Sequence, residues 1–205
     1  MAPPGSCYAS GMRSPPETPW IGRRALPADV LIGLIADTHI PEARATLWEE
    51  VYGALDGVDV ILHAGDMHDV VVLDWLERVA PVIAVRGNGD DGGSGRPVQP
   101  HDPRLAHNQV VTAGGLRIGM THTFNDLTAL GTSVAQQIAR HFGEPVDVVV
   151  AGDTHVPEVT ELGGVLLVNP GSPTLPRNLQ TQFGTIGFLH VRAGRIADVW
   201  IELLH

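Results

Sequence analysis

The chain has 205 residues and a mass of 21.8 kDa, with a formal net charge of −10 from 23 acidic and 13 basic side chains. Hydrophobic residues make up 43% of it, which is typical of a folded domain and more than a disordered chain carries. No run approaches the ~18–20 apolar residues of a membrane-spanning helix, and a single cysteine excludes an intrachain disulfide framework.

Residues 1–28 contain six prolines, with glycine and serine between them. This density of proline predicts no regular structure, so we expect a flexible N-terminal extension followed by one domain over residues 29–205. The extension lacks a basic segment followed by an apolar core, which argues against a secretory signal. Together with the single cysteine, this favours a cytoplasmic protein.

Short apolar runs alternate with helical patterns in the first half of the domain. Strands are predicted over residues 30–36, 58–62 and 82–85, and helices over residues 43–55 and 70–79. This order predicts a parallel sheet with helices packed on it. The segment 87–103, rich in Gly, Asp and Pro, is predicted to be a loop.

The second half favours antiparallel strands. Residues 109–112 and 116–121 flank Ala113-Gly114-Gly115, which predicts a hairpin. A helix over 128–142 and strands over 146–151, 156–160, 165–168, 184–191 and 195–204 complete the pattern. A parallel half followed by an antiparallel half indicates an α/β fold of two packed sheets covered by helices.

Residues able to bind metal ions follow five of these strands. The segments are Asp37-Thr38-His39, His63-Ala64-Gly65-Asp66, Arg86-Gly87-Asn88, Thr121-His122 and Gly152-Asp153-Thr154-His155. Strand carboxyl ends in α/β sheets face the crevice where ligands bind. One such residue is more often a cap or turn residue, but five strand ends together indicate a shared site. Carboxylate, amide and imidazole donors without cysteine favour Mn²⁺, Fe or Zn²⁺.

In this order, the five motifs resemble the signature of the calcineurin-like metallophosphoesterases. Asp37-Thr38-His39-Ile40-Pro41, His63-Ala64-Gly65-Asp66 and Asn169-Pro170-Gly171-Ser172-Pro173 resemble its compact bacterial and archaeal phosphodiesterase branch more narrowly. That branch also includes the retromer subunit with the same fold. The resemblance runs from about residue 30 to the C-terminus and implies a four-layer α-β-β-α sandwich with two mixed β-sheets.

The resemblance also implies a centre of two divalent cations, with Mn²⁺ expected and Fe, Zn²⁺ or Ni²⁺ as alternatives. Asp37, His39 and His155 are expected to hold the first cation, Asp66 to bridge both, and Asn88, His122 and Asp153 to hold the second. Asp66, Asn88 and His122 are the residues expected to act in catalysis. A hydroxide bound between two such cations would attack phosphorus in line.

Two residues depart from the family pattern. Asp153 stands where the family usually has histidine, which favours a harder ion such as Mn²⁺ at the second position. Gly89 stands where many members have a histidine after the asparagine, so leaving-group protonation would need another group or little assistance. His68 is one substitute, although a surface position at a helix start is the preferred interpretation. Arg86 is expected to pair with Asp90 or, as the less favoured alternative, to touch the substrate.

These observations predict a phosphoesterase acting on small phosphorylated substrates, with diesters favoured over monoesters. The alternative is a scaffold that binds a protein partner, as the retromer subunit does, with a weakened metal site. The net charge of −10 argues against a nuclease or another nucleic-acid binder. Apolar edge strands in such small sandwiches often pair, so a homodimer is also expected.

Overall fold

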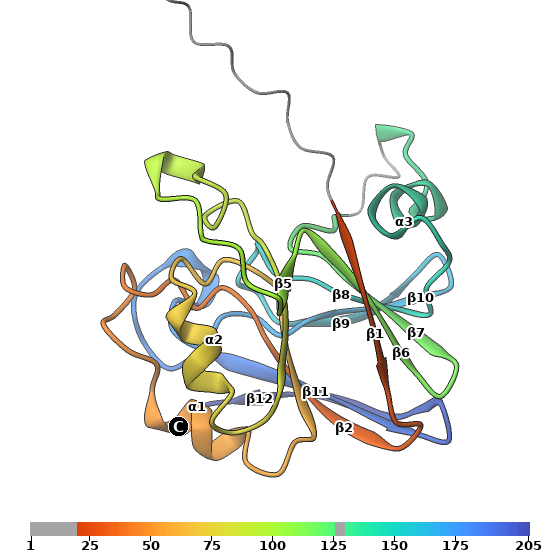
Figure 1. The fold of residues 1–205 in the computed structure, drawn as a ribbon, viewed down its shortest axis with the longest axis horizontal. Helices are drawn as coiled ribbons and strands as arrows, with labels where there is room; N and C mark the ends of the chain where they lie inside the picture. The colour runs from red at the N-terminus through yellow and green to blue at the C-terminus, as the bar shows by residue number, and fades with distance from the viewer. Residues whose placement is uncertain (1–19, 126–129) are drawn as a thin grey trace, which may run out of the picture.

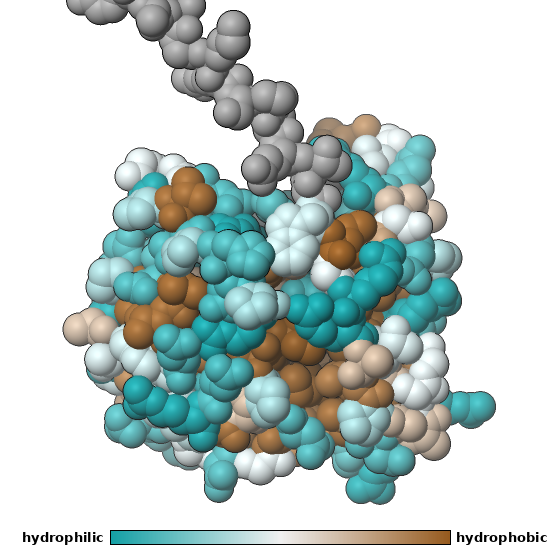
Figure 2. Space-filling model, in the orientation of Figure 1, coloured by the Kyte–Doolittle hydropathy of each residue, from teal (hydrophilic) through white to brown (hydrophobic). Residues whose placement is uncertain are grey.

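The computed structural model describes residues 20–125 and 130–205, in which two six-stranded mixed sheets lie face to face (Figure 1). Helices cover the outer side of each sheet, so the predicted α-β-β-α order is confirmed. No helix within these two segments is long and apolar enough to span a membrane. On the face shown in Figure 2, hydrophilic residues predominate and apolar ones form separate groups.

One sheet has the strand order β12-β11-β2-β3-β4-β5. Its strands are β2 (Val30–Ile35), β3 (Val60–His63), β4 (Val82–Val85), β5 (Leu105–Ala106), β11 (Thr185–Arg192) and β12 (Arg195–Leu203). The β2 to β5 strands are parallel, as the first-half pattern predicts, and β11 is antiparallel to both β2 and β12. The C-terminal hairpin β11–β12 therefore completes this sheet by pairing with β2, the first strand that the sequence predicts.

The other sheet has the order β1-β6-β7-β8-β10-β9. Its strands are β1 (Ile21–Leu26), β6 (Asn108–Ala113), β7 (Leu116–Met120), β8 (Val148–Val150), β9 (Glu158–Leu162) and β10 (Val165–Asn169). The predicted hairpin is the antiparallel β6–β7 pair. Because β8 pairs in parallel with both β7 and β10, this sheet is mixed.

The prediction that the folded domain begins at residue 29 is wrong. Strand β1 pairs in parallel with β6 along its whole length, from Ile21 opposite Asn108 to Leu26 opposite Ala113. It is an edge strand with no face continuously buried, and its two central arginines leave no apolar run to recognise. Residues 1–19 of the predicted extension lie outside the described residues.

The helices are shorter than their patterns predict. They are α1 (Glu49–Ala54), α2 (Val71–Leu76) and α3 (Val134–Phe142), with 3₁₀ turns η1 (Gly93–Gly95) and η3 (Pro176–Asn178). Helix α3 begins at Val134 because Ser133 caps it: the Ser133 hydroxyl accepts the Gln136 N–H, and the Gln136 side chain accepts the Ser133 N–H. The predicted start at residue 128 lies outside the described residues.

The core forms three apolar layers. The inner layer lies between the sheets and includes Leu34, Leu62, Ile118 and Val150. A second layer packs α1 and α2 on the β2–β3–β4 sheet, and a third packs α3 on the opposite sheet. Both sheets are thus fixed by burial on two sides, which holds the loops at their ends in place.

Candidate metal centre

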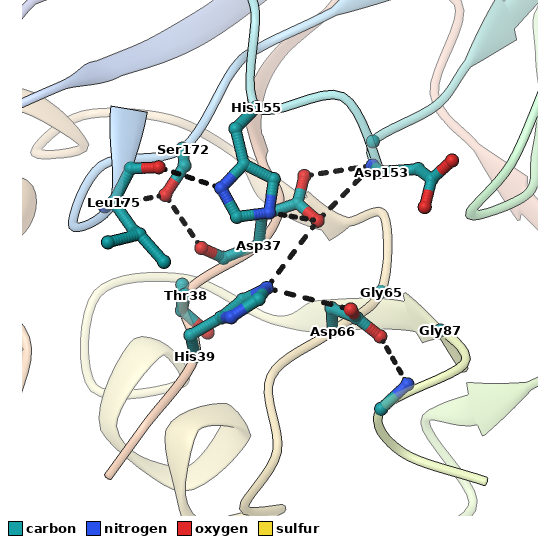
Figure 3. Close-up of polar contacts among 12 residues, drawn as sticks. Asp37, Thr38, His39, Gly65, Asp66, Gly87, Asp153, His155, Ser172 and Leu175 are labelled. Atoms are coloured by element: carbon teal, nitrogen blue, oxygen red, sulfur yellow. Dashed lines mark hydrogen bonds and ion pairs between the residues drawn. The ribbon is translucent and has the colours of Figure 1, made fainter. Parts of the chain in front are cut away.

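The expected ligands come from the ends of both sheets and meet in one place. Asp37 and His39 follow β2, and Asp66 follows β3. In the opposite sheet His122 follows β7, while Asp153 and His155 follow β8. Figure 3 shows His39 and Asp66, from one sheet, and His155, from the other, lying around the Asp37 carboxylate, which also accepts the Asp153 N–H. The predicted convergence of strand-end residues is what the structure shows for these six.

Tight backbone turns at the strand ends orient these ligands. Asp37, His39, Asp66, Asp153 and His155 all have positive φ, between 47° and 71°. For residues with a side chain this conformation is uncommon, and it clusters at functional sites where surrounding structure holds it. The Asp37 N–H donates to Gly65 O at 2.9 Å and the His39 N–H to Asp66 O at 3.1 Å, so the two loops support each other.

The first group of donor atoms surrounds Asp37, which is fully buried. Oδ1 of Asp37 lies 3.4 Å from Nε2 of His155 and 3.9 Å from Nε2 of His39. Two donors of one ion, each about 2.0–2.2 Å from it, can lie no more than twice that distance apart. These separations therefore suit a cation between the three side chains.

The second group surrounds His122. Its Nε2 lies 3.5 Å from Oδ1 of Asp66, 3.6 Å from Oδ1 of Asp153 and 3.9 Å from Oδ1 of Asp37. The other oxygen of Asp66, Oδ2, lies 3.5 Å from Nε2 of His39. The two oxygens of Asp66 therefore face different histidines, as a carboxylate bridging two ions would.

Asn88 is not drawn into this cluster. It follows β4 as expected, but it is exposed, unlike the other six expected ligands. It lines an open hollow of about 490 Å³ together with His122, Arg86 and Arg140. The structure thus places Asn88 at the mouth of the centre, beside the second group.

Imidazole nitrogens that face the cluster have no partner among the described residues. Nε2 of His39, His68 and His122 are all buried without a hydrogen bond. Nδ1 of His122 donates to Ala64 O at 2.8 Å, and Nδ1 of His155 donates to Leu175 O at 2.7 Å. Because a carbonyl can only accept, these contacts put the proton on Nδ1 and leave Nε2 free to bind a metal. The residues present therefore fit divalent cations.

The centre gathers three carboxylates that bound cations would stabilise in their ionised form. Burial, together with Asp66 and Asp153, raises the pKa of Asp37 to about 8. Burial also acts to raise the pKa of Asp66, but contacts with His122 and His68 lower it overall. In the part of the chain that the structure describes, no arginine forms an ion pair with Asp37, Asp66 or Asp153. Bound cations would hold all three carboxylates ionised.

Histidine pKa values move in both directions here. Burial lowers the pKa of His39 to about 3, so this ring is neutral and ready to coordinate. Burial acts in the same direction on His122, but contact with Asp66 and the charge of Asp37 raise its pKa to about 9. A cation bound to Nε2 of His122 would take the place of that proton.

The last residue of β10 and the segment after it hold the backbone of two loops that carry expected ligands. The Ser172 hydroxyl donates to the backbone oxygen of Asp37 at 2.7 Å, and the Thr174 hydroxyl donates to that of Thr38 at 2.8 Å. The Asn169 amide donates to Gly152 O at 2.8 Å. Residues 169–174 therefore hold the backbone of the loops that follow β2 and β8.

Asp90 has a role that sequence reasoning missed. Its Oδ2 accepts the N–H groups of Asp66 and Gly87 at 2.9 and 2.8 Å, and its Oδ1 accepts that of His68 at 2.8 Å. Arg86 does not form the expected ion pair with Asp90: its guanidinium pairs with Asp91 at 3.0 Å and meets only the backbone oxygen of Asp90, at 3.5 Å. The position of Asp90, two residues after Asn88, was the one sign in the sequence that it belongs to the site. Its three hydrogen-bond donors are backbone N–H groups, which no residue pattern reveals.

The preferred surface interpretation of His68 is also wrong. Its side chain is 1% exposed, and Nε2 lies 3.7 Å from Oδ2 of Asp66. His63 is buried beside the cluster: its Nε2 lies 3.1 Å from the Thr38 hydroxyl, and its Nδ1 accepts the Gly65 N–H. Both histidines therefore belong to the surroundings of the ligand loops.

Comparison with known proteins decides the family. The calcineurin-like phosphoesterase superfamily domain matches residues 30–194. The chain belongs to this superfamily. It is 38% identical over 150 residues to a probable metallophosphoesterase of Methanothermobacter thermautotrophicus, covering 72% of this chain and 80% of that protein. The resemblance recognised from the strand-end motifs is confirmed.

Solved structures share the fold of this metallophosphoesterase. Vacuolar protein sorting 29 from Cryptosporidium parvum superposes with a TM-score of 0.62 at 22% identity, covering 86% of this chain and 98% of that one. A novel archaeal phosphodiesterase superposes with a TM-score of 0.56 at 24% identity, covering 85% of this chain and 99% of that one. At these identities the likeness concerns the fold alone, and it confirms the compact architecture.

Proposed function

We propose that this metallophosphoesterase uses two divalent cations, preferentially Mn²⁺, to hydrolyse phosphodiester bonds in small molecules. The observation that carries the proposal is the placement of Asp66, whose Oδ1 lies 3.5 Å from His122 and whose Oδ2 lies 3.5 Å from His39. One carboxylate facing two histidine groups is the arrangement that a bridged pair of ions requires. Such a pair supplies a hydroxide nucleophile and neutralises charge on the phosphoryl oxygens.

The protein's own residues would orient this chemistry. Asp37 and His155, which are buried, and His39, which is half-buried, would form the inner side of the centre. His122 and Asn88 form the open side, where they line the hollow with Arg86 and Arg140. A phosphoryl group entering there would meet His122 and Asn88, and the arginines would face its negative charge.

Two departures from the family pattern, Asp153 and Gly89, determine which metal ion and which substrates we expect the protein to prefer. With Asp153, three carboxylates and a bridging hydroxide would balance two divalent cations, whereas histidine there would leave one positive charge. The extra carboxylate oxygen supports Mn²⁺ over Zn²⁺ at the second position. Gly89 supplies no proton to a leaving group, which supports substrates that need little such assistance.

A scaffold function is the second candidate. Two observations favour it: Asn88 is exposed, and the Asp153 side chain is 36% exposed, so the second position is the less enclosed of the two. Against it, His39, His122 and His155 are all present, with Nε2 facing carboxylates at 3.4–3.9 Å. A retained ligand set supports the enzyme.

The test is hydrolysis of bis(p-nitrophenyl) phosphate and p-nitrophenyl phosphate by metal-stripped protein titrated with Mn²⁺, Zn²⁺ and Mg²⁺. We expect turnover restored best by Mn²⁺, with the larger kcat/KM for the diester. Asp66→Asn should abolish it, while Asp56→Asn, the same change at an exposed position, should not. A folded protein without turnover under any metal would favour the scaffold.

A further inference from the structure

His68 reaches the centre from a position to which no motif assigns a role. Its ring centroid lies 4.0 Å from that of His39, and its Nε2 lies 3.7 Å from Oδ2 of Asp66. Nε2 of His39 lies 3.5 Å from the same oxygen. The donor atoms of His39, Asp66 and His68 all lie within 4.8 Å of one another. His68 therefore stands toward Asp66 much as an expected ligand does.

A carboxylate fixes the orientation of the His68 ring. Nδ1 of His68 donates to Oε2 of Glu42 at 2.8 Å, and the other oxygen of Glu42 accepts from Nε of Arg96 at 2.9 Å. Metal-binding histidines commonly donate their second ring N–H to a carboxylate in this way, which sets the tautomer and raises ligand basicity. The contact leaves the lone pair of Nε2 directed inward.

That inward nitrogen has nothing to bind within the described residues. Nε2 of His68 is buried without a hydrogen-bond partner, a property it shares with His39 and His122. An unpartnered buried acceptor is costly unless a ligand satisfies it. Among the described imidazoles, the three with this property all face Asp66 at 3.5–3.7 Å.

Gly89 leaves the space that the His68 ring fills. A Cβ atom at position 89 would lie 2.3 Å from Nε2 and 2.5 Å from Cδ2 of His68. No residue with a side chain fits at position 89 while His68 keeps this place. The His68 ring can therefore occupy this place only because position 89 is a glycine.

We propose that His68 is a further metal ligand, coordinating through Nε2 the cation that His39 and Asp66 hold, with Glu42 as its positioning residue. The proposal rests on the metal centre of the proposed function. An added imidazole raises the number of protein donors around that cation, which suits six-coordinate Mn²⁺ or Fe better than tetrahedral Zn²⁺.

The experiment measures metal binding directly. Mn²⁺ is titrated into metal-stripped protein and the free ion is followed by electron paramagnetic resonance. His68→Ala should weaken Mn²⁺ binding at the first position, lined by His39 and Asp66, by at least about tenfold, and Glu42→Gln by less, because the ring stays but loses its charged anchor. His205→Ala, at an exposed histidine, serves as the matched control and should change nothing.

A second readout separates coordination from mere packing. In the Co²⁺-loaded protein, each coordinating imidazole gives a hyperfine-shifted exchangeable N–H signal in the proton spectrum. His68→Ala should lose one such signal, and His205→Ala none. Gly89→Ala should weaken Mn²⁺ binding although alanine removes no donor, because its methyl group displaces the His68 ring.

Loss of the proposed His68 coordination and loss of the proposed phosphodiesterase function give different results in these experiments. Unchanged Mn²⁺ affinity with an unchanged number of shifted signals, in a folded His68→Ala protein, would overturn the proposal whatever happens to turnover. If His68→Ala does not fold, His68→Asn and Gly89→Ala provide the same comparison. Absence of phosphodiester turnover would refute the proposed function alone, because these measurements need no substrate.

Discussion

Nε2 of His122 lies 3.6 Å from Oδ1 of Asp153, the carboxylate at the position where the family resemblance leads one to expect histidine. Asp153→His would exchange a hard oxygen donor for a nitrogen that Zn²⁺ binds well. We expect the Zn²⁺ to Mn²⁺ affinity ratio at the second position to rise by about tenfold or more, where tenfold corresponds to roughly 1.4 kcal/mol. Competition titrations of both ions measure this, with Asp153→Asn as control, and an unchanged ratio would contradict the assignment.

Metal-free protein should lose stability as the pH rises above neutrality. The pKa of Asp37, raised by burial to about 8, and that of His122, raised by Asp66 and Asp37 to about 9, both exceed their unfolded values of 3.8 and 6.5. The folded state therefore holds more protons than the unfolded state between pH 6.5 and 9, and its stability falls through that window. Below pH 6.5 the buried neutral His39 and His63, both with a pKa near 3, reverse the slope.

Thermal unfolding with and without Mn²⁺ checks this expectation. Tm of the stripped protein should be highest near pH 6–6.5 and lower at pH 9. Because metals bind the deprotonated ligands, the increase in Tm on adding Mn²⁺ should be larger at pH 8.5 than at pH 6. A stripped protein that becomes more stable from pH 6.5 to 9 would show that these groups are not buried as described.

Asp90→Asn should disturb the centre without removing any ligand. An amide has one oxygen, whereas both carboxylate oxygens of Asp90 accept backbone N–H groups, from Asp66, Gly87 and His68. At least one of these donors would face an NH₂ group, at a cost of about 1–3 kcal/mol in unfolding free energy. Urea unfolding measures the loss. Asp91→Asn, which breaks a surface pair with Arg86, should cost less than about 1 kcal/mol, and equal costs would contradict the role of Asp90.

Removal of β1 should be costly although its sequence resembles an extension. A chain that begins at residue 20 keeps the pairing of Ile21–Leu26 with β6, whereas one that begins at residue 29 loses it. With each net hydrogen bond worth ~0.5–1.5 kcal/mol, the shorter chain should be less stable by about 2 kcal/mol or more. Urea unfolding of the two proteins measures the difference, and equal stability would return the domain boundary to residue 29.

Local signals carried most of the correct predictions. The strand β4 was predicted with its observed bounds, and the hairpin followed from Gly114-Gly115 between two apolar runs. Both patterns lie within a few residues, where side-chain alternation and turn chemistry act directly. The strand-end residues were recognisable for the same reason, since each motif directly follows an apolar run, and their role as metal ligands stays a prediction. The homodimer and the cytoplasmic location stay predictions.

The errors concern residues whose environment comes from elsewhere in the chain. His68 is buried because Glu42 and Gly89, distant in sequence, surround it. Asp90 is held by backbone groups, which no residue pattern encodes. Strand β1 became recognisable only through its partner β6. In each case long-range packing overrides the local preference that a sequence displays.

Strand β2, which delivers Asp37, lies between β3 and β11 in its sheet. During synthesis, every expected ligand has left the ribosome once His155 has emerged, yet β2 then still lacks its neighbour on one side. Until β11 is made, the strand that delivers Asp37 is therefore an edge strand of its sheet. A product released before β11 would present its histidines and carboxylates on an open sheet, exposed to proteases and to whichever metal the cell has in excess.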